Sequence, residues 1–157
     1  MVELMYSLDC ECLRAAERRR LDAFRCRSLR AISKIPHSMI SHTTNAEVYM
    51  AAEIPPLTVL LDERQLKLYG RIASLPDTSM LRSSLFVPGT MVLQSLAGVR
   101  ARGRPCLTWA SVQHARAIET LSNCGMTLEA FFREQPFSST RWAQLTRFSF
   151  TACNGML

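Results

Sequence analysis

The feature that most constrains the fold is a run of apolar residues between positions 57 and 75 that recur at intervals of three and four. Pro55 and Pro56 precede this run and Pro76 follows it. Such spacing places the side chains on one face of a helix, and proline ends helices because it lacks an amide proton. The sequence therefore predicts a long helix with a buried face. The positions on this face are Leu57, Leu60, Leu61, Leu68, Ile72 and Leu75, with Arg64 at the same spacing.

Capping signals predict further helices on both sides of this one. Thr44-x-x-Glu47 is a capping box before a helix at 45–52. Asp77 is expected to cap a short helix at 80–85, and Thr108 and Thr127 to cap helices at 109–121 and 128–134. A last helix is expected at 139–148, with Trp142, Leu145 and Phe148 on one face. Its aromatic side chains are expected in the core rather than stacked on bases.

These elements predict a mainly α fold, a small multi-helix bundle of about six helices with a basic irregular loop near residues 87–105. We expect a helical lobe at 1–89 with a basic helix at 15–35, a flexible basic loop at 90–107 and a C-terminal helical segment at 108–157. The 157 residues fit one domain or two small lobes.

No apolar run approaches the roughly 20 residues of a membrane-spanning helix. The N-terminus carries acidic residues where a signal or transit peptide carries basic ones. We therefore expect a protein of the nucleus or cytoplasm, with no signal peptide, no transmembrane segment and no membrane partner.

The positive charge is concentrated in one stretch of the chain. Eight basic and two acidic side chains between residues 14 and 34 give a local charge of +6, equal to the net charge of the whole chain. On a helix at about 100° per residue, apolar positions are expected on one side and basic positions on the other. The mainly apolar side holds Leu21, Phe24, Ser28, Ala31, Ile32 and Ile35, and the basic side holds Arg19, Arg20, Arg27, Arg30 and Lys34.

Three interpretations fit this amphipathic helix. A guanidinium matches the geometry of phosphate, so the basic face suits the backbone of RNA or DNA. A solvated helix face without a ligand has equal weight, because charge runs on helices are common. Attachment to an anionic membrane surface is the third, weaker because the apolar face resembles a core face. A second candidate site for nucleic acid is the loop with Arg100, Arg102 and Arg104, which also fits a mobile surface loop.

The sequence offers no metal site and no recognisable active site. The six cysteines form no C-x-x-C pair, so free buried thiols are the simpler interpretation. Phosphate-binding glycine loops, serine-hydrolase motifs and the adjacent aspartates of a polymerase palm are missing from the sequence. We expect no catalytic residue, no cofactor, no metal and no small-molecule substrate.

A series of short motifs in fixed order resembles the region after the reverse transcriptase domain of non-LTR (LINE-like) retrotransposon polyproteins. The similarity covers roughly residues 1–110. Cys106 departs from the family pattern, which usually has a basic residue there. The motifs are residues 15–24, Leu29-Arg30-Ala31-Ile32, Asn45-Ala46-Glu47-Val48, Pro56-Leu57, Glu63-Arg64-Gln65-Leu66, Leu68-Tyr69-Gly70-Arg71, Pro76-Asp77 and Gly103-Arg104-Pro105-x-x-Thr108-Trp109.

In this family the segment is a helical extension in the thumb and linker territory, which holds template RNA and target DNA. The resemblance implies a non-catalytic, nucleic-acid-contacting fragment of an RNA-directed DNA polymerase, whose polymerase domain would be an absent partner. The alternative is a structural or interaction module, or a non-functional translated relic of a retroelement.

Overall fold

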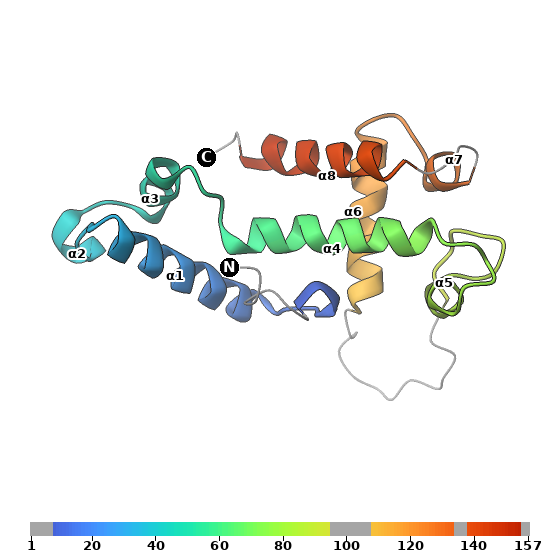
Figure 1. The fold of residues 1–157 in the computed structure, drawn as a ribbon, viewed down its shortest axis with the longest axis horizontal. Coiled ribbons are helices and arrows are strands. Elements are labelled where there is room, and N and C mark those ends of the chain that lie inside the picture. Colours follow the sequence, from blue (N-terminus) through green and yellow to red (C-terminus); the bar gives the residue numbers. More distant parts are fainter. Residues whose placement is uncertain (1–7, 95–107, 134–137, 155–157) are drawn as a thin grey trace. The chain divides into compact units, whose positions relative to one another are not determined.

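The structure, a computed structural model, describes residues 8–94, 108–133 and 138–154, and these residues are mainly helical, as the sequence predicts (Figure 1). A short 3-10 helix, η2, precedes eight α-helices in the described residues. The bounds are η2 Leu8–Cys10, α1 Ala15–Ile32, α2 Ser38–Ser41, α3 Asn45–Ala52, α4 Leu57–Ala73, α5 Met80–Leu85, α6 Trp109–Ser122, α7 Leu128–Phe132 and α8 Ser139–Asn154.

The chain divides into two compact units. One is Leu13–Asp62, and the other combines Met1–Cys12 with Glu63–Leu157. The division falls within α4, whose first residues belong to the smaller unit and whose remainder belongs to the larger one.

Threonine caps begin three helices where the sequence predicts them. The hydroxyl of Thr44 accepts from the Glu47 amide at 3.3 Å, and the Glu47 carboxylate accepts from the Thr44 amide at 2.7 Å. Thr108 and Thr127 accept in the same way from amides three residues later, at 3.3 and 3.2 Å. These bonds satisfy amides that the first helical turn leaves free.

Several helix ends differ from the sequence predictions, and the largest differences are at the ends of α1 and α8. α1 ends at Ile32 rather than residue 35, because Lys34 adopts a left-handed conformation with φ 54° and the Ile35 amide donates back to the Arg30 carbonyl at 2.9 Å. This is a Schellman-type closure, which stops the helix before Pro36. α8 continues to Asn154 rather than ending at Phe148, whose side chain lies outside the described residues.

Asp77 does not cap α5, contrary to the sequence prediction. Ser79 occupies the N-cap position, and Asp77 Oδ1 instead accepts from Nε of Arg82 at 2.7 Å. Arg82 is buried and also donates to the carbonyls of Ala73 and Thr90. The carboxylate is drawn to a buried guanidinium, since a charge without a partner is costly to bury.

The larger unit has an aromatic core and a buried polar link. Its central buried side chains come from α4, α6, α7, α8 and the turn after α5, namely Leu66, Tyr69, Ala73, Phe86, Met91, Ala117, Leu121, Phe131, Phe132 and Trp142. The buried Gln65 donates to the carbonyls of Leu8 and Glu11 at 2.9 and 2.8 Å and accepts from Gln113 at 2.9 Å. This amide therefore fixes η2 to α4 and α6.

The smaller unit packs α1 against α3. Cys26, Leu29 and Val48 form its buried cluster, and Cys26 Sγ donates to Asn45 Oδ1 at 3.1 Å. The Tyr49 hydroxyl donates to the Asp22 carbonyl at 2.8 Å, and burial raises the pKa of Tyr49 to about 12. These contacts bury the face of α1 that carries Cys26 and Leu29.

Candidate nucleic-acid interface

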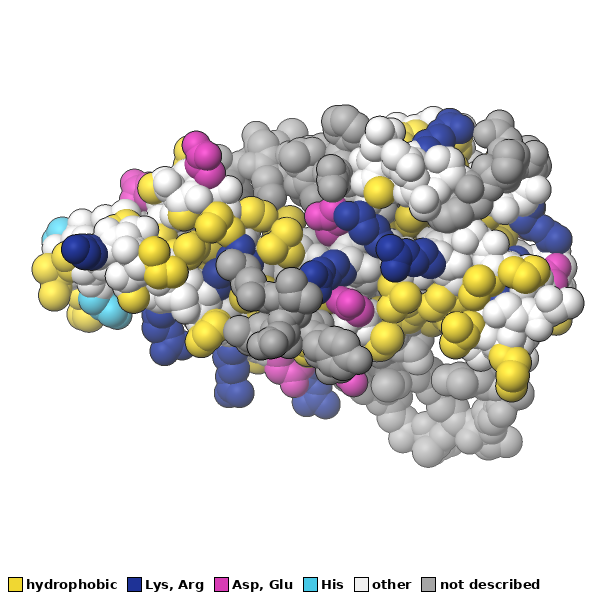
Figure 2. All heavy atoms as spheres, viewed as in Figure 1, with side chains coloured by type: hydrophobic (Ala, Val, Ile, Leu, Met, Phe, Trp, Pro, Cys, Tyr) yellow, Lys and Arg dark blue, Asp and Glu magenta, His cyan; other side chains and the backbone are white. Residues whose placement is uncertain are grey.

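An exposed row of basic side chains runs along α1. Arg19, Arg20 and Arg27 are exposed on the helix, and the exposed Lys34 follows its end. Arg20 and Arg27 lie two helical turns apart, about 10 Å along the axis. Figure 2 shows dark-blue Lys and Arg side chains projecting along the outer edge of the region that α1 occupies in Figure 1. The row offers several guanidinium groups to a ligand outside the protein.

These arginines keep their donors available. Arg19 and Arg20 form no hydrogen bond or ion pair with the described residues through their side chains, and Arg27 bonds only to the Ala23 carbonyl of its own helix, at 3.3 Å. A guanidinium has five N–H donors, so most remain free to bind oxygen atoms of a ligand.

Arg30 does not belong to the exposed row, contrary to the sequence prediction. It is buried, and its guanidinium donates to the carbonyls of Pro36 and Thr43 at 2.9 and 2.5 Å and to Ser41 Oγ at 3.4 Å. The chain after α1 folds back around this side chain. Arg30 therefore holds the loop at 33–43 in place and does not face a ligand.

The predicted apolar face of α1 is also wrong in part. Phe24 and Ile32 are 48% and 77% exposed, whereas Cys26 and Leu29 are buried. The helical wheel groups apolar residues, but the buried face is the one that meets Val48 of α3. That face is rotated relative to the predicted one and includes a cysteine and charged side chains.

Both acids in the basic stretch accept hydrogen bonds from other groups, and the exposed Glu17 carboxylate accepts from the Arg14 amide at 2.7 Å. The Asp22 carboxylate accepts from the Thr58 amide at 3.0 Å and from its hydroxyl at 2.7 Å, so it caps the first turn of α4 from another helix. Asp62 accepts from Arg18 in an ion pair. Asp22 therefore does not neutralise the exposed row, although the sequence places it among the arginines.

The guanidinium of Arg25 is buried, and two of its nitrogen atoms lack hydrogen-bond partners in the described residues. The residue is 5% exposed, and its Nε and Nη1 atoms have no hydrogen-bond partner in the described residues. Because a buried guanidinium loses its hydration, this position costs folding free energy. The sequence gives no signal that separates Arg25 from its exposed neighbours.

Arg100, Arg102 and Arg104 lie outside the described residues, and so does most of the predicted loop at 90–107.

Within the described residues no group of three or more His, Cys, Asp or Glu side chains is placed to hold a metal ion. None of the helices in that part of the chain has the length and apolar character that spanning a bilayer requires.

Comparison with protein family models, with curated proteins and with solved structures found no match to this chain.

Proposed function

We propose that this chain is a non-catalytic segment that binds the phosphate backbone of RNA or DNA. The observation that carries the proposal is the exposed row of Arg19, Arg20, Arg27 and Lys34. The two acids of this stretch, Glu17 and Asp22, accept hydrogen bonds from the amides of Arg14 and Thr58. Backbone binding needs several cations spaced along one surface and no particular base contacts. Arg30 is left out of this interface because it is buried.

The proposal places the chain with the helical segment that follows the reverse transcriptase domain of non-LTR retrotransposons. The motif order in the sequence is the support for this ancestry, and the helical fold is consistent with it. Arg100, Arg102 and Arg104 extend the proposed contact in sequence, outside the described residues.

The test is the salt dependence of binding to duplex DNA and to single-stranded RNA, measured by fluorescence anisotropy. Neutralising four phosphates through the exposed row gives a slope of log K against log salt of about −3.6 on duplex DNA, and contacts by Arg100, Arg102 and Arg104 would make it steeper. Removing two of these contacts in Arg19→Gln/Arg27→Gln should reduce the slope by about 1.8.

The matched control is Arg71→Gln/Arg133→Gln, which removes two exposed charges that belong to the larger unit and not to α1. Binding through the exposed row leaves the slope of this control unchanged. If the chain binds neither duplex DNA nor single-stranded RNA at low salt, the proposal is wrong. An equal loss in the two variants assigns the association to net charge alone and favours the structural or interaction module, whose arginines keep a helical bundle solvated.

A further inference from the structure

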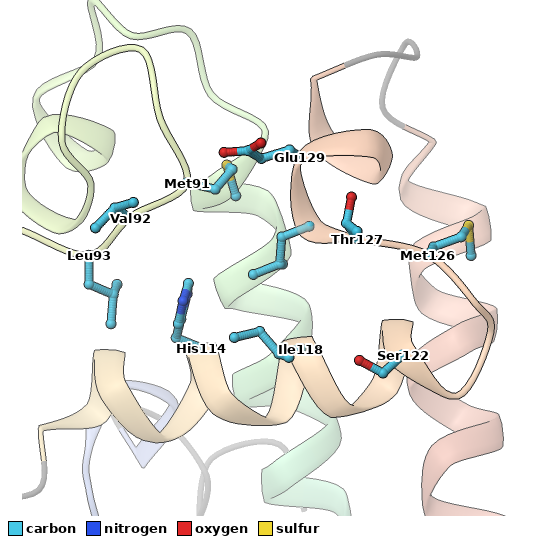
Figure 3. Close-up of a pocket in the computed structure, with 10 residues that line it drawn as sticks. Met91, Val92, Leu93, His114, Ile118, Ser122, Met126, Thr127 and Glu129 are labelled. Atoms are coloured by element: carbon cyan, nitrogen blue, oxygen red, sulfur yellow. The ribbon is translucent and has the colours of Figure 1, made fainter.

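A cavity of about 610 Å³ opens in the larger unit, between the turn after α5, one face of α6 and the start of α7. Pockets that bind small molecules usually have volumes of about 300–1,000 Å³. Figure 3 shows side chains from these three elements turned toward a common space. The cavity therefore has the size of a ligand site, and it belongs to one unit of the chain.

The walls are mainly apolar and carry no positive charge. Met91, Val92, Leu93, Ile118, Met126 and Leu128 line it, and Val92 and Ile118 remain 60% and 45% exposed. Glu129 is the acidic side chain of the lining, which contains no Lys or Arg. An apolar ligand buries these surfaces favourably, whereas a carboxylate or phosphate meets no cation and one acid.

The polar side chain of His114 lines the cavity, and its contact with Tyr69 fixes which ring nitrogen carries the proton. The Tyr69 hydroxyl is fully buried, and its hydrogen-bond partner is Nδ1 of His114 at 2.7 Å. If Nδ1 carried the proton, the tyrosine O–H would be a buried donor without an acceptor, which is costly. The O–H therefore donates to Nδ1, and the ring proton of neutral His114 lies on Nε2.

His114 then presents a donor to the cavity. Burial lowers the pKa of His114, so the ring is neutral at pH 7. Nε2 has no hydrogen-bond partner in the described residues, and Figure 3 shows the ring directed from α6 into the cavity. The cavity thus combines mainly apolar walls with one fixed N–H donor, and Ser122 and Thr127 complete its lining.

We propose that this cavity binds a small uncharged molecule with an apolar body and a carbonyl oxygen, which accepts a hydrogen bond from Nε2 of His114. The apolar body contacts the methionine and aliphatic side chains of the turn, α6 and α7. This site is independent of the exposed arginine row on α1.

The experiment compares two probes that differ only in the acceptor, butyrophenone and butylbenzene. Titrations of the full chain are followed by the methyl NMR signals of Met91, Ile118 and Leu128. Both probes should shift these signals, with butyrophenone binding about fivefold more tightly, the usual worth of one hydrogen bond. In His114→Phe the two affinities should become equal.

A cavity-filling variant and its control keep the test decisive if His114→Phe fails to fold. Ile118→Trp should abolish binding of both probes, while Ala115→Trp, exposed on the same helix outside the lining, should bind as the wild type does. The ring nitrogen spectrum of 15N-histidine-labelled wild type should place the His114 proton on Nε2. A proton on Nδ1, cavity signals that do not move with butyrophenone, or a ketone preference that survives in His114→Phe overturns the proposal.

Discussion

Replacing Gly70 with alanine tests the core of the larger unit, because sequence reasoning and the structure give opposite signs. Gly70 is buried within α4, and the indole of Trp142 occupies the space beside it. A β-carbon at position 70 would lie 2.6 Å from Cε2 of Trp142 and closer still to two other indole atoms. The indole Nε1 of Trp142 donates to the carbonyl of Leu66 at 3.0 Å, and Leu66 lies one turn before Gly70 on α4.

The magnitude follows from three contributions. Alanine is favoured over glycine in a helix by about 1 kcal/mol. Overpacking a dense core costs about 1–3 kcal/mol, and leaving the indole N–H unpaired in the core costs about 1–3 kcal/mol more. We expect Gly70→Ala to lower the free energy of unfolding by about 1–5 kcal/mol.

The assay is urea unfolding followed by circular dichroism and tryptophan fluorescence, with the slope against urea checked for constancy. In a Trp142→Ala background the steric conflict is gone, so Gly70→Ala should become stabilising by about 1 kcal/mol. A stabilising effect of Gly70→Ala with Trp142 present would refute the packing argument, and an equal effect in both backgrounds would show that the two side chains are not coupled.

The remaining predictions concern the arginines of α1 and the histidine of the cavity. Arg30→Gln should lower the free energy of unfolding by about 2–4 kcal/mol, since it removes the hydrogen bonds of a buried guanidinium to Pro36 and Thr43. The exposed Arg27→Gln should change it by less than about 0.5 kcal/mol in the same urea experiment. Arg25→Met should leave stability unchanged or raise it, because it removes a buried charge with two unpartnered nitrogens; a loss of more than about 1 kcal/mol would contradict this. Burial lowers the pKa of His114 from 6.5, so the unfolded chain binds more protons between the two pKa values, and the free energy of unfolding should fall as pH drops below about 7 toward the folded-state pKa. That fall should be smaller in His114→Phe. The same pH dependence in both proteins would contradict the assignment of this effect to His114.

The sequence by itself determined most of the helices, because their signals are local. The capping box at Thr44 and Glu47 predicts α3 with its observed bounds, and Thr108 and Thr127 begin α6 and α7 as expected. A capping threonine bonds an amide three residues away, so both partners are visible in a short window of sequence. The helical fold class follows from the same local patterns.

Only the tertiary structure decided the roles of individual charged residues. Arg27 and Arg30 look equivalent in the sequence, yet one is exposed and the other is surrounded by the loop that follows α1. Asp77 carries a capping signal, yet it bonds to Arg82, and Asp22 caps a helix 35 residues further along the chain. A charged side chain bonds to whatever partner the fold brings within about 3 Å, and that distance depends on contacts far apart in sequence.

The two proposed sites differ in how far the sequence predicts them, because one depends on local residues and the other on contacts far apart in sequence. The basic stretch at 14–34 is visible in the sequence because charge accumulates locally, although its exposed members had to be read from the fold. The cavity beside His114 has no sequence signal, since its walls come from three elements and its donor is fixed by Tyr69, 45 residues earlier. Local spacing specified the helices, and the packing of distant side chains specified which groups are free to bind.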